Sequence, residues 1–178
     1  FGKPATTEKV DGRIRSHRHD SEGVSIAEAF LERLRAPTEL VDRVGVLVRH
    51  HLAPGLYFRN GATAKGYRRL ARDLKARGVT MELLLRVATA DHFGRTTKDA
   101  LARQYPAGTH FRQQMETLEL VVEAPKDVVL GRHLIARGLH PGKVFGDILA
   151  RCREVQDEHG WDDPDKILDA VLTEGDSK

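Results

Sequence analysis

The stretch ELVDRVGVLVRHHLAP, residues 39–54, decides the fold class. Its apolar residues recur at spacings of three and four, the period of an α-helix with one buried face: Leu40, Val41, Val44, Leu47 and Val48. Pro37 precedes the stretch as a helix-starting residue, and the Ala-Pro-Gly run at 53–55 is typical of a helix end. The segment therefore predicts a helix that begins near Pro37 and ends with His50 and His51.

Helical periodicity continues along most of the chain. Further helices are predicted at residues 24–34, 63–77, 80–92, 109–120, 128–137, 141–158 and 164–172. A strand is compatible only with residues 118–122, and that run continues a helical pattern as well. After Pro125 the sequence pattern changes to three predicted helices joined by runs that contain Gly and Pro. We therefore predict an all-α protein, with a helical bundle over residues 1–124 and a C-terminal helical subdomain over 125–178.

The composition fits one domain, or one compact domain with an appended subdomain. At 178 residues and 40% hydrophobic content, the chain can bury a core without disulfides or a structural metal. The single cysteine, Cys152, favours a reducing cytoplasm. No run approaches the roughly 18 apolar residues of a membrane span, so no membrane partner is expected. A formal charge of +3 permits a polyanionic partner without requiring one.

Four candidate metal ligands stand at the ends of predicted helices. His19 lies just before the first of them, His50 and His51 close the helix described above, and Asp91 lies near the end of the 80–92 helix. If the apolar stripe continues from Leu47, one of the two adjacent histidines faces inward. Helix ends from separate segments can meet at one end of a bundle, and imidazoles and carboxylates bind divalent metals there.

Each of these residues also has a purely structural explanation. A histidine at a helix end commonly lies at the surface or caps the last carbonyls, and we expect His92 at the surface. Asp20 is better explained as the N-cap of its helix than as a ligand. Asp91 has Arg86 and Arg95 as alternative partners. The residues by themselves leave the metal site and the structural explanation about equally favoured.

The chain resembles the HD domain of bacterial tRNA nucleotidyltransferase/poly(A) polymerase family proteins. The resemblance is carried, in order, by FGKPATT (1–7), HRHDSEGV (17–24), VRHHLAP (48–54), ADHFGR (90–95) and LIARGLHPGKVFGDILARCREVQDEHG (134–160). In that family a helix ending in His-Asp is followed by a hydrophobic residue, Gly and Lys, which Phe1-Gly2-Lys3 matches. We therefore expect a fragment whose defining His-Asp pair lies just before Phe1. His19-Asp20 is then a later element of the pattern.

The resemblance implies an HD-type helical bundle that binds a divalent metal such as Mg²⁺, Mn²⁺, Ni²⁺ or Co²⁺. It implies that His19, His50, His51 and Asp91 are metal ligands or phosphate contacts. Lys3 would be a phosphate-facing cation, so that Lys3 and Asp91 are the candidate catalytic residues. Such a site suits phosphoester hydrolysis, because a metal polarises the phosphoryl oxygen and makes a bound water nucleophilic near neutral pH.

A second set of residues could bind RNA. Basic side chains gather on and around the predicted 63–77 helix and at the start of the 141–158 helix, and the candidate RNA or phosphate contacts are Arg68, Arg69, Arg72, Lys75 and Lys143. Such charges raise affinity for phosphates without determining sequence preference. The alternative explanation is a solvated helix face. Trp161 is expected to anchor packing rather than to stack on a base.

The resemblance thus implies a cytoplasmic, metal-dependent phosphohydrolase or phosphodiesterase domain of a CCA-adding tRNA nucleotidyltransferase/poly(A) polymerase-like protein. Its expected partners are a nucleotide, or the 3′ end of RNA or tRNA, and an attached nucleotidyltransferase head. The alternative is a non-catalytic helical body that holds tRNA or RNA for that head. A stand-alone phosphohydrolase for small signalling nucleotides is a third hypothesis.

Overall fold

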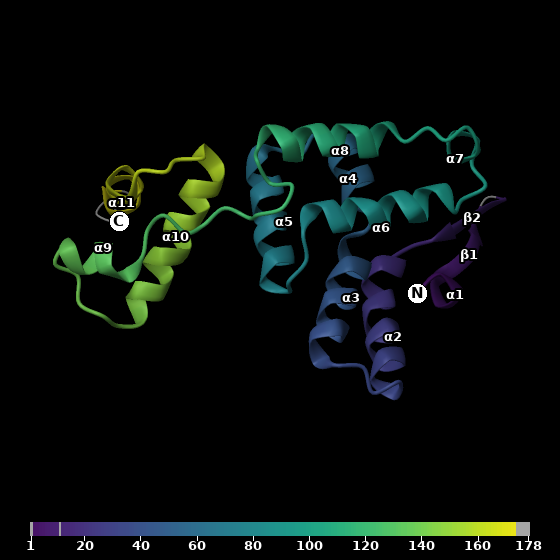
Figure 1. Cartoon of the computed structure of the whole chain (residues 1–178), viewed down its shortest axis with the longest axis horizontal. Coiled ribbons are helices and arrows are strands. Elements are labelled where there is room, and N and C mark those ends of the chain that lie inside the picture. The colour runs from purple at the N-terminus through teal and green to yellow at the C-terminus, as the bar shows by residue number, and fades with distance from the viewer. Residues whose placement is uncertain (1, 11, 174–178) are drawn as a thin grey trace.

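A computed structural model describes residues 2–10 and 12–173, and it confirms the predicted all-α fold. The elements in chain order are α1 (Lys3–Thr6), β1 (Thr7–Val10), β2 (Arg13–Ser16), α2 (His19–Arg33), α3 (Thr38–His50), α4 (Ala53–Asn60), α5 (Ala64–Ala76), α6 (Met81–Phe93), α7 (Lys98–Leu101), α8 (Pro106–Thr117), α9 (Gly131–Ala136), α10 (Lys143–His159) and α11 (Pro164–Thr173). Figure 1 shows α9, α10 and α11 grouped apart from the preceding helices.

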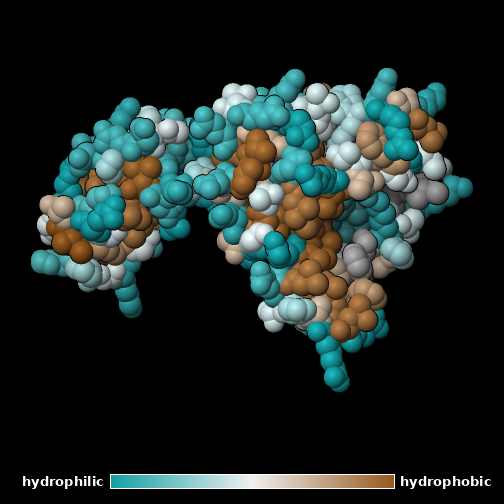
Figure 2. Space-filling view, in the orientation of Figure 1, coloured by the Kyte–Doolittle hydropathy of each residue, from teal (hydrophilic) through white to brown (hydrophobic). Residues whose placement is uncertain are grey.

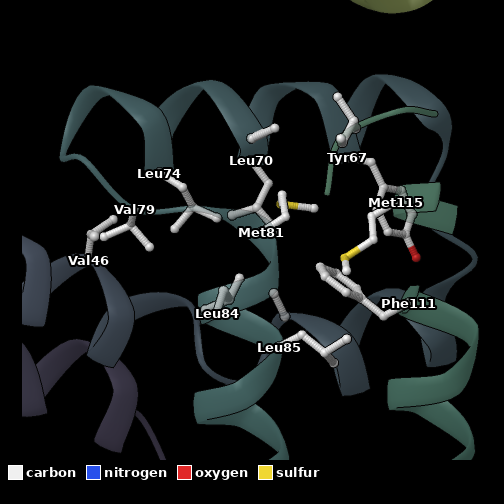
Figure 3. Packing of buried hydrophobic residues seen from close by; sticks show 13 residues of the cluster. Val46, Tyr67, Leu70, Leu74, Val79, Met81, Leu84, Leu85, Phe111 and Met115 are labelled. Carbon is white, nitrogen blue, oxygen red and sulfur yellow. The ribbon is translucent and has the colours of Figure 1, made fainter. Parts of the chain in front are cut away.

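The larger hydrophobic core lies between α3, α5, α6 and α8. Fully buried side chains from these helices meet there, and Figure 3 shows them interdigitating: Leu74, Met81, Leu84, Phe111 and Met115. The ring of Tyr67 packs against Phe111 with their centroids 5.1 Å apart. This core fixes the relative positions of α3 and α6, which carry most of the candidate ligands.

A second, smaller core joins α9, α10 and α11. Its fully buried members are Leu134, Ile167 and Leu168, and Trp161 packs against its edge as expected. The described members of the larger core end at Ala124, and those of the smaller core begin at Val128.

The helix α10 of the smaller core packs against α5 of the larger core, and arginines of α5 bind residues on the α10 side of this junction. The Nε of Arg72 donates to the carboxylate of Asp157 at 3.0 Å, and its Nη1 donates to Asp127. Arg68 donates to the backbone carbonyl of Asp157 at 2.6 Å. Only 3% of Asp157 is exposed, so its carboxylate depends on Arg72 for a compensating charge. The junction is therefore held by ion pairs as well as by apolar packing.

The helices α2 and α3 form an antiparallel hairpin beside α6 (Figure 1). Figure 2 shows apolar side chains on this hairpin, where α2 and α3 leave large residues exposed: Ile26, Phe30, Leu34 and Leu40. No helix in the described ranges is both long enough and apolar enough to cross a membrane.

Three details differ from the sequence-based predictions. The Ala-Pro-Gly run at 53–55 predicts a helix end, but these residues begin α4, because Pro54 is favourable in a first helical turn. The hairpin of β1 and β2 was not predicted, and its four-residue strands pair antiparallel from Thr7 with Ser16 to Val10 with Arg13. Residues 118–122 form neither a strand nor a helix.

Candidate metal and phosphate site

A cavity of about 360 Å³ brings together most of the predicted site residues. Lys3 reaches it from α1, His19 from the start of α2, His51 from the end of α3 and Asp91 from α6. Its apolar walls come from α3 and α6: Val44, Leu47, Val48 and Val87. Segments separated by up to 88 residues thus converge on one space, as the helix-end positions of their polar residues predicted.

Within this cavity, His19 and His51 point their Nε2 atoms at each other across 3.1 Å. The other ring nitrogen of each histidine faces a backbone carbonyl, Ser16 O at 2.7 Å and Val48 O at 2.6 Å. A carbonyl oxygen only accepts, so each Nδ1 must carry the hydrogen. In the neutral rings both Nε2 atoms then present lone pairs to each other, an arrangement that a cation or an additional proton between them would stabilise.

Burial makes the additional proton unfavourable on His51. It lowers the pKa of this imidazole, and the nearby charges of His19 and Lys3 lower it further. The hydrogen bond to the Val48 carbonyl and the charge of Asp91 act in the opposite direction and do not compensate. The neutral form of His51, which is the form that ligates metals, therefore predominates near neutral pH.

Asp91 supplies a negative charge to the same cavity. Partial burial would raise the pKa of its carboxyl group, but hydrogen bonds from Lys3 and Arg95 lower it to about 2. The Nζ of Lys3 lies 2.6 Å from one carboxylate oxygen, and Arg95 contacts the other. Arg95 is one of the two alternative partners that the sequence indicated, while Arg86 pairs with Glu82 instead.

The histidine pair fits a divalent metal ion. Two nitrogens that each lie about 2.05 Å from one ion are about 2.9 Å apart in octahedral and about 3.3 Å apart in tetrahedral geometry, and the observed 3.1 Å lies between. The Nδ1 contacts with carbonyls are those that orient metal-bound histidines. No group of three or more histidine, cysteine or carboxylate side chains in the described chain is arranged to hold an ion. Asp91 is engaged by Lys3 instead.

His50 does not join the other predicted ligands. Its Nε2 bonds to the carboxylate of Asp73 on α5, 2.7 Å away, and it does not line the cavity. Its neighbour His51 follows Leu47 by four residues and lines the cavity with it, so it is the one of the two histidines that was predicted to face inward. The inward member of the pair is therefore His51.

Two sequence-based interpretations were wrong. Asp20 is not the N-cap of α2, because the helix begins at His19 and the N-cap is Arg18; Asp20 lies in the first turn, where its charge favours the helix dipole. His92 is not at the surface. It is buried, its Nε2 bonds to the carbonyl of Gln104 at 2.8 Å, and it follows Leu84 and Ala88 along the buried face of α6.

The candidate RNA contacts do not form one track. Arg68 and Arg72 are directed into the junction with α10, as described above. Arg69 and Lys75 are exposed on α5, whereas Lys143 is exposed at the start of α10. Two of the five side chains thus stabilise the fold, and a smaller cationic surface remains for a polyanion.

Gly2 determines how the segment that carries Lys3 packs on α2. Its φ is +77°, and a Cβ at this position would lie 2.3 Å from the carbonyl oxygen of His19 and 2.9 Å from the Cα of Gly23. Only glycine combines this backbone conformation with so close an approach. Gly2 therefore lets the backbone lie directly against the first turns of α2, with Lys3 directed towards Asp91.

We expect Gly2→Ala to release residues 2–6 from α2 and to break the contact between Lys3 and Asp91. In metal-free protein, NMR titration should then show the pKa of Asp91 rising from about 2 towards its ordinary value. Gly12→Ala is the matched control, since Gly12 has a similar φ of +75° but no atom near its absent Cβ. If both variants leave the pKa of Asp91 unchanged, Gly2 does not position Lys3.

Comparison with known proteins gave no match: no family model, no curated protein and no solved structure resembles the chain significantly.

Proposed function

We propose that this protein contains a metal-dependent phosphohydrolase domain of the HD type, which acts on nucleotide or RNA-terminal phosphates. The observation that carries the proposal is the contact between His19 and His51. Two imidazoles are held by backbone carbonyls in the tautomer that directs both free Nε2 lone pairs to one point. Asp91 and Lys3 line the same cavity and add an anion and a cation beside that point.

His19 and His51 would hold the metal, and Asp91 is the carboxylate that lines the same cavity and could complete its ligands. The bound metal would polarise a phosphoryl oxygen and lower the pKa of a water molecule. Lys3 would offset the negative charge of the phosphate, because its half-exposed side chain lines the cavity. The apolar wall of Leu47, Val48 and Val87 would keep bulk water away, which strengthens these electrostatic interactions.

The adjacent histidines of α3 provide a matched test. In His51→Ala, one of the two facing nitrogens is removed, and we expect the affinity for Mn²⁺ or Co²⁺ in calorimetric titration to fall at least about tenfold, since outer-shell changes alone cost 10–100-fold. His50→Ala removes only a contact with Asp73 and should bind metal like the wild type.

In the presence of the metal, His51→Ala should also hydrolyse p-nitrophenyl phosphate more slowly than the wild type, whereas His50→Ala should keep the wild-type rate. His19→Ala should behave like His51→Ala in both assays. The proposal fails if the wild type binds neither ion. It also fails if His50→Ala and His51→Ala lose equal affinity.

A further inference from the structure

A second cavity, of about 400 Å³, borders the same histidine. We call it the α4–α8 cavity, because α4 and the start of α8 form two of its walls and the end of α6 forms a third. These three helices pack against one another in pairs (Figure 1). His51 lines both cavities, and Arg95 of the second cavity binds Asp91 of the first. The two cavities are therefore neighbours that share His51.

The α4–α8 cavity has an aromatic wall. Tyr105 stacks on the buried ring of His92, with the ring centroids 4.2 Å apart and an angle of 16° between the ring planes. This stacking fixes the orientation of the tyrosine ring. Gly108 makes room for this ring, because a Cβ there would lie 2.3 Å from Tyr105 Cδ1. Phe58 also lines the cavity, and it leaves 51% of its surface exposed. An exposed aromatic side chain beside a fixed ring offers apolar surface to a planar group.

The cavity also has cationic side chains. Arg59 lines it, and no residue within 2–10 or 12–173 makes an ion pair or hydrogen bond with the Arg59 side chain. Arg95 lies between the cavity and Asp91. Asp99 supplies one opposing negative charge. The cavity therefore combines an unpaired guanidinium group, which suits phosphate oxygens, with aromatic surface, which suits a ring.

Its volume lies in the range of about 300–1,000 Å³ typical of small-molecule sites. A compact ligand with one planar ring system and one phosphate group matches this combination of size, charge and aromatic surface. A ligand that spans from the aromatic wall towards His51 would place its phosphate beside the candidate metal ligands, because the two cavities share that residue.

We propose that the α4–α8 cavity binds the leaving group of a phosphate monoester whose alcohol carries a planar ring, such as a nucleoside. This inference rests on the proposed phosphohydrolase function. Phe58 and Tyr105 would contact the ring, and Arg59 would contact the phosphate. In hydrolysis, the oxygen of water bonds to phosphorus and the ester P–O bond breaks. The leaving alkoxide takes a proton from the water, and the products are the free alcohol and inorganic phosphate.

The test compares two probes, adenosine monophosphate and glycerol phosphate, which share the phosphate but not the ring. We expect calorimetry to show that the wild type binds adenosine monophosphate at least about tenfold more tightly. Phe58→Ala should remove most of this preference, since base–aromatic stacking contributes the equivalent of about tenfold or more in affinity. Arg59→Ala should weaken the binding of both probes about tenfold, as expected for a lost charge-assisted hydrogen bond.

Arg86→Ala is the matched control for Arg59→Ala, because Arg86 is an exposed arginine that does not line either cavity. Gly108→Ala gives a second test of the aromatic wall, because an added Cβ displaces the Tyr105 ring. This variant should reduce the preference for adenosine monophosphate over glycerol phosphate while keeping both Arg59 and Arg95.

The inference is overturned if the wild type binds the two probes equally or binds neither. It is also overturned if Phe58→Ala and Arg59→Ala both bind like the wild type. Metal titration of the same variants separates the two proposals. Intact Mn²⁺ binding with no ring preference rejects only the α4–α8 cavity, whereas absent Mn²⁺ binding in the wild type rejects the phosphohydrolase.

Discussion

Replacing Arg72 with alanine is expected to lower the free energy of unfolding by about 3–5 kcal/mol, the cost of leaving a buried partner charge uncompensated. The side chain of Arg72 is 18% exposed and binds both Asp127 and the buried Asp157. Without it, the carboxylate of Asp157 keeps its burial but loses its only side-chain donor among the described residues. Urea denaturation monitored by circular dichroism would measure this decrease in the free energy of unfolding.

Arg69→Ala is the matched control for that experiment. Arg69 lies one turn earlier on α5, is exposed and has no described ion pair, so its replacement should change the stability by less than about 0.5 kcal/mol. Asp157→Asn combined with Arg72→Ala should restore part of the loss, because the uncompensated charge is then absent. Equal stability of Arg72→Ala and Arg69→Ala would show that the ion pairs of Arg72 do not help to hold α10 on α5.

Phe111→Ala is expected to destabilise the protein by about 3–5 kcal/mol, as for other large core aromatics. Phe111 is completely buried, and its ring packs against Tyr67 (Figure 3) and against Tyr57. Its removal would leave a cavity where α5 and α8 meet. Because α8 also carries Gly108 near its start, the loss of stability should be accompanied by greater mobility of the residues that line the α4–α8 cavity. Thermal unfolding by calorimetry would measure the change.

Phe58→Ala provides the comparison at an exposed position. Phe58 contacts His110 but keeps half of its surface in solvent, so we expect a loss below about 1 kcal/mol. The two phenylalanines should thus separate stability from ligand binding, with Phe111 affecting the first and Phe58 the second. A loss below 1 kcal/mol for Phe111→Ala would contradict the packing of this core.

The repeated apolar spacing was sufficient to predict the long helices. The helices α3, α5, α6 and α10 begin and end within a few residues of their predicted bounds, because each has a continuous apolar face. The short elements could not be predicted in the same way. In α4 the apolar pattern covers barely two turns, and its Ala-Pro-Gly start is equally typical of a helix end.

The site was predictable in its residue types but only partly in its geometry. The stripe that continues from Leu47 indicates that one of the two adjacent histidines faces inward, and the structure shows that this residue is His51. By contrast, nothing in local spacing predicts that Lys3 meets Asp91, since 88 residues separate them and a close glycine contact brings them together. The metal ligation and the chemistry inferred from the HD resemblance stay predictions.

The basic residues of α5 show another limit of prediction from sequence. Their spacing is the same whether they bind a polyanion or another part of the chain. Arg68 and Arg72 bind α10 because Asp157 and its carbonyl are buried against them, a fact that depends on residues 85 or more positions away. A count of charges on one helix cannot distinguish these two uses.

The β1–β2 hairpin connects Lys3 and His19, and this connection has a consequence for dynamics. The two residues flank one small unit, which is closed by the strand pairing and by the 2.7 Å contact between Thr7 Oγ1 and Ser16 Oγ. Such a unit opens as a whole in local unfolding, at a smaller cost than the core. The cation and one imidazole would then leave the cavity in a single event, while His51 and Asp91 stay on the core helices. Assembly of the site is therefore expected to be a two-state process, and amide hydrogen exchange of residues 2–10 and 12–19 would report its equilibrium constant.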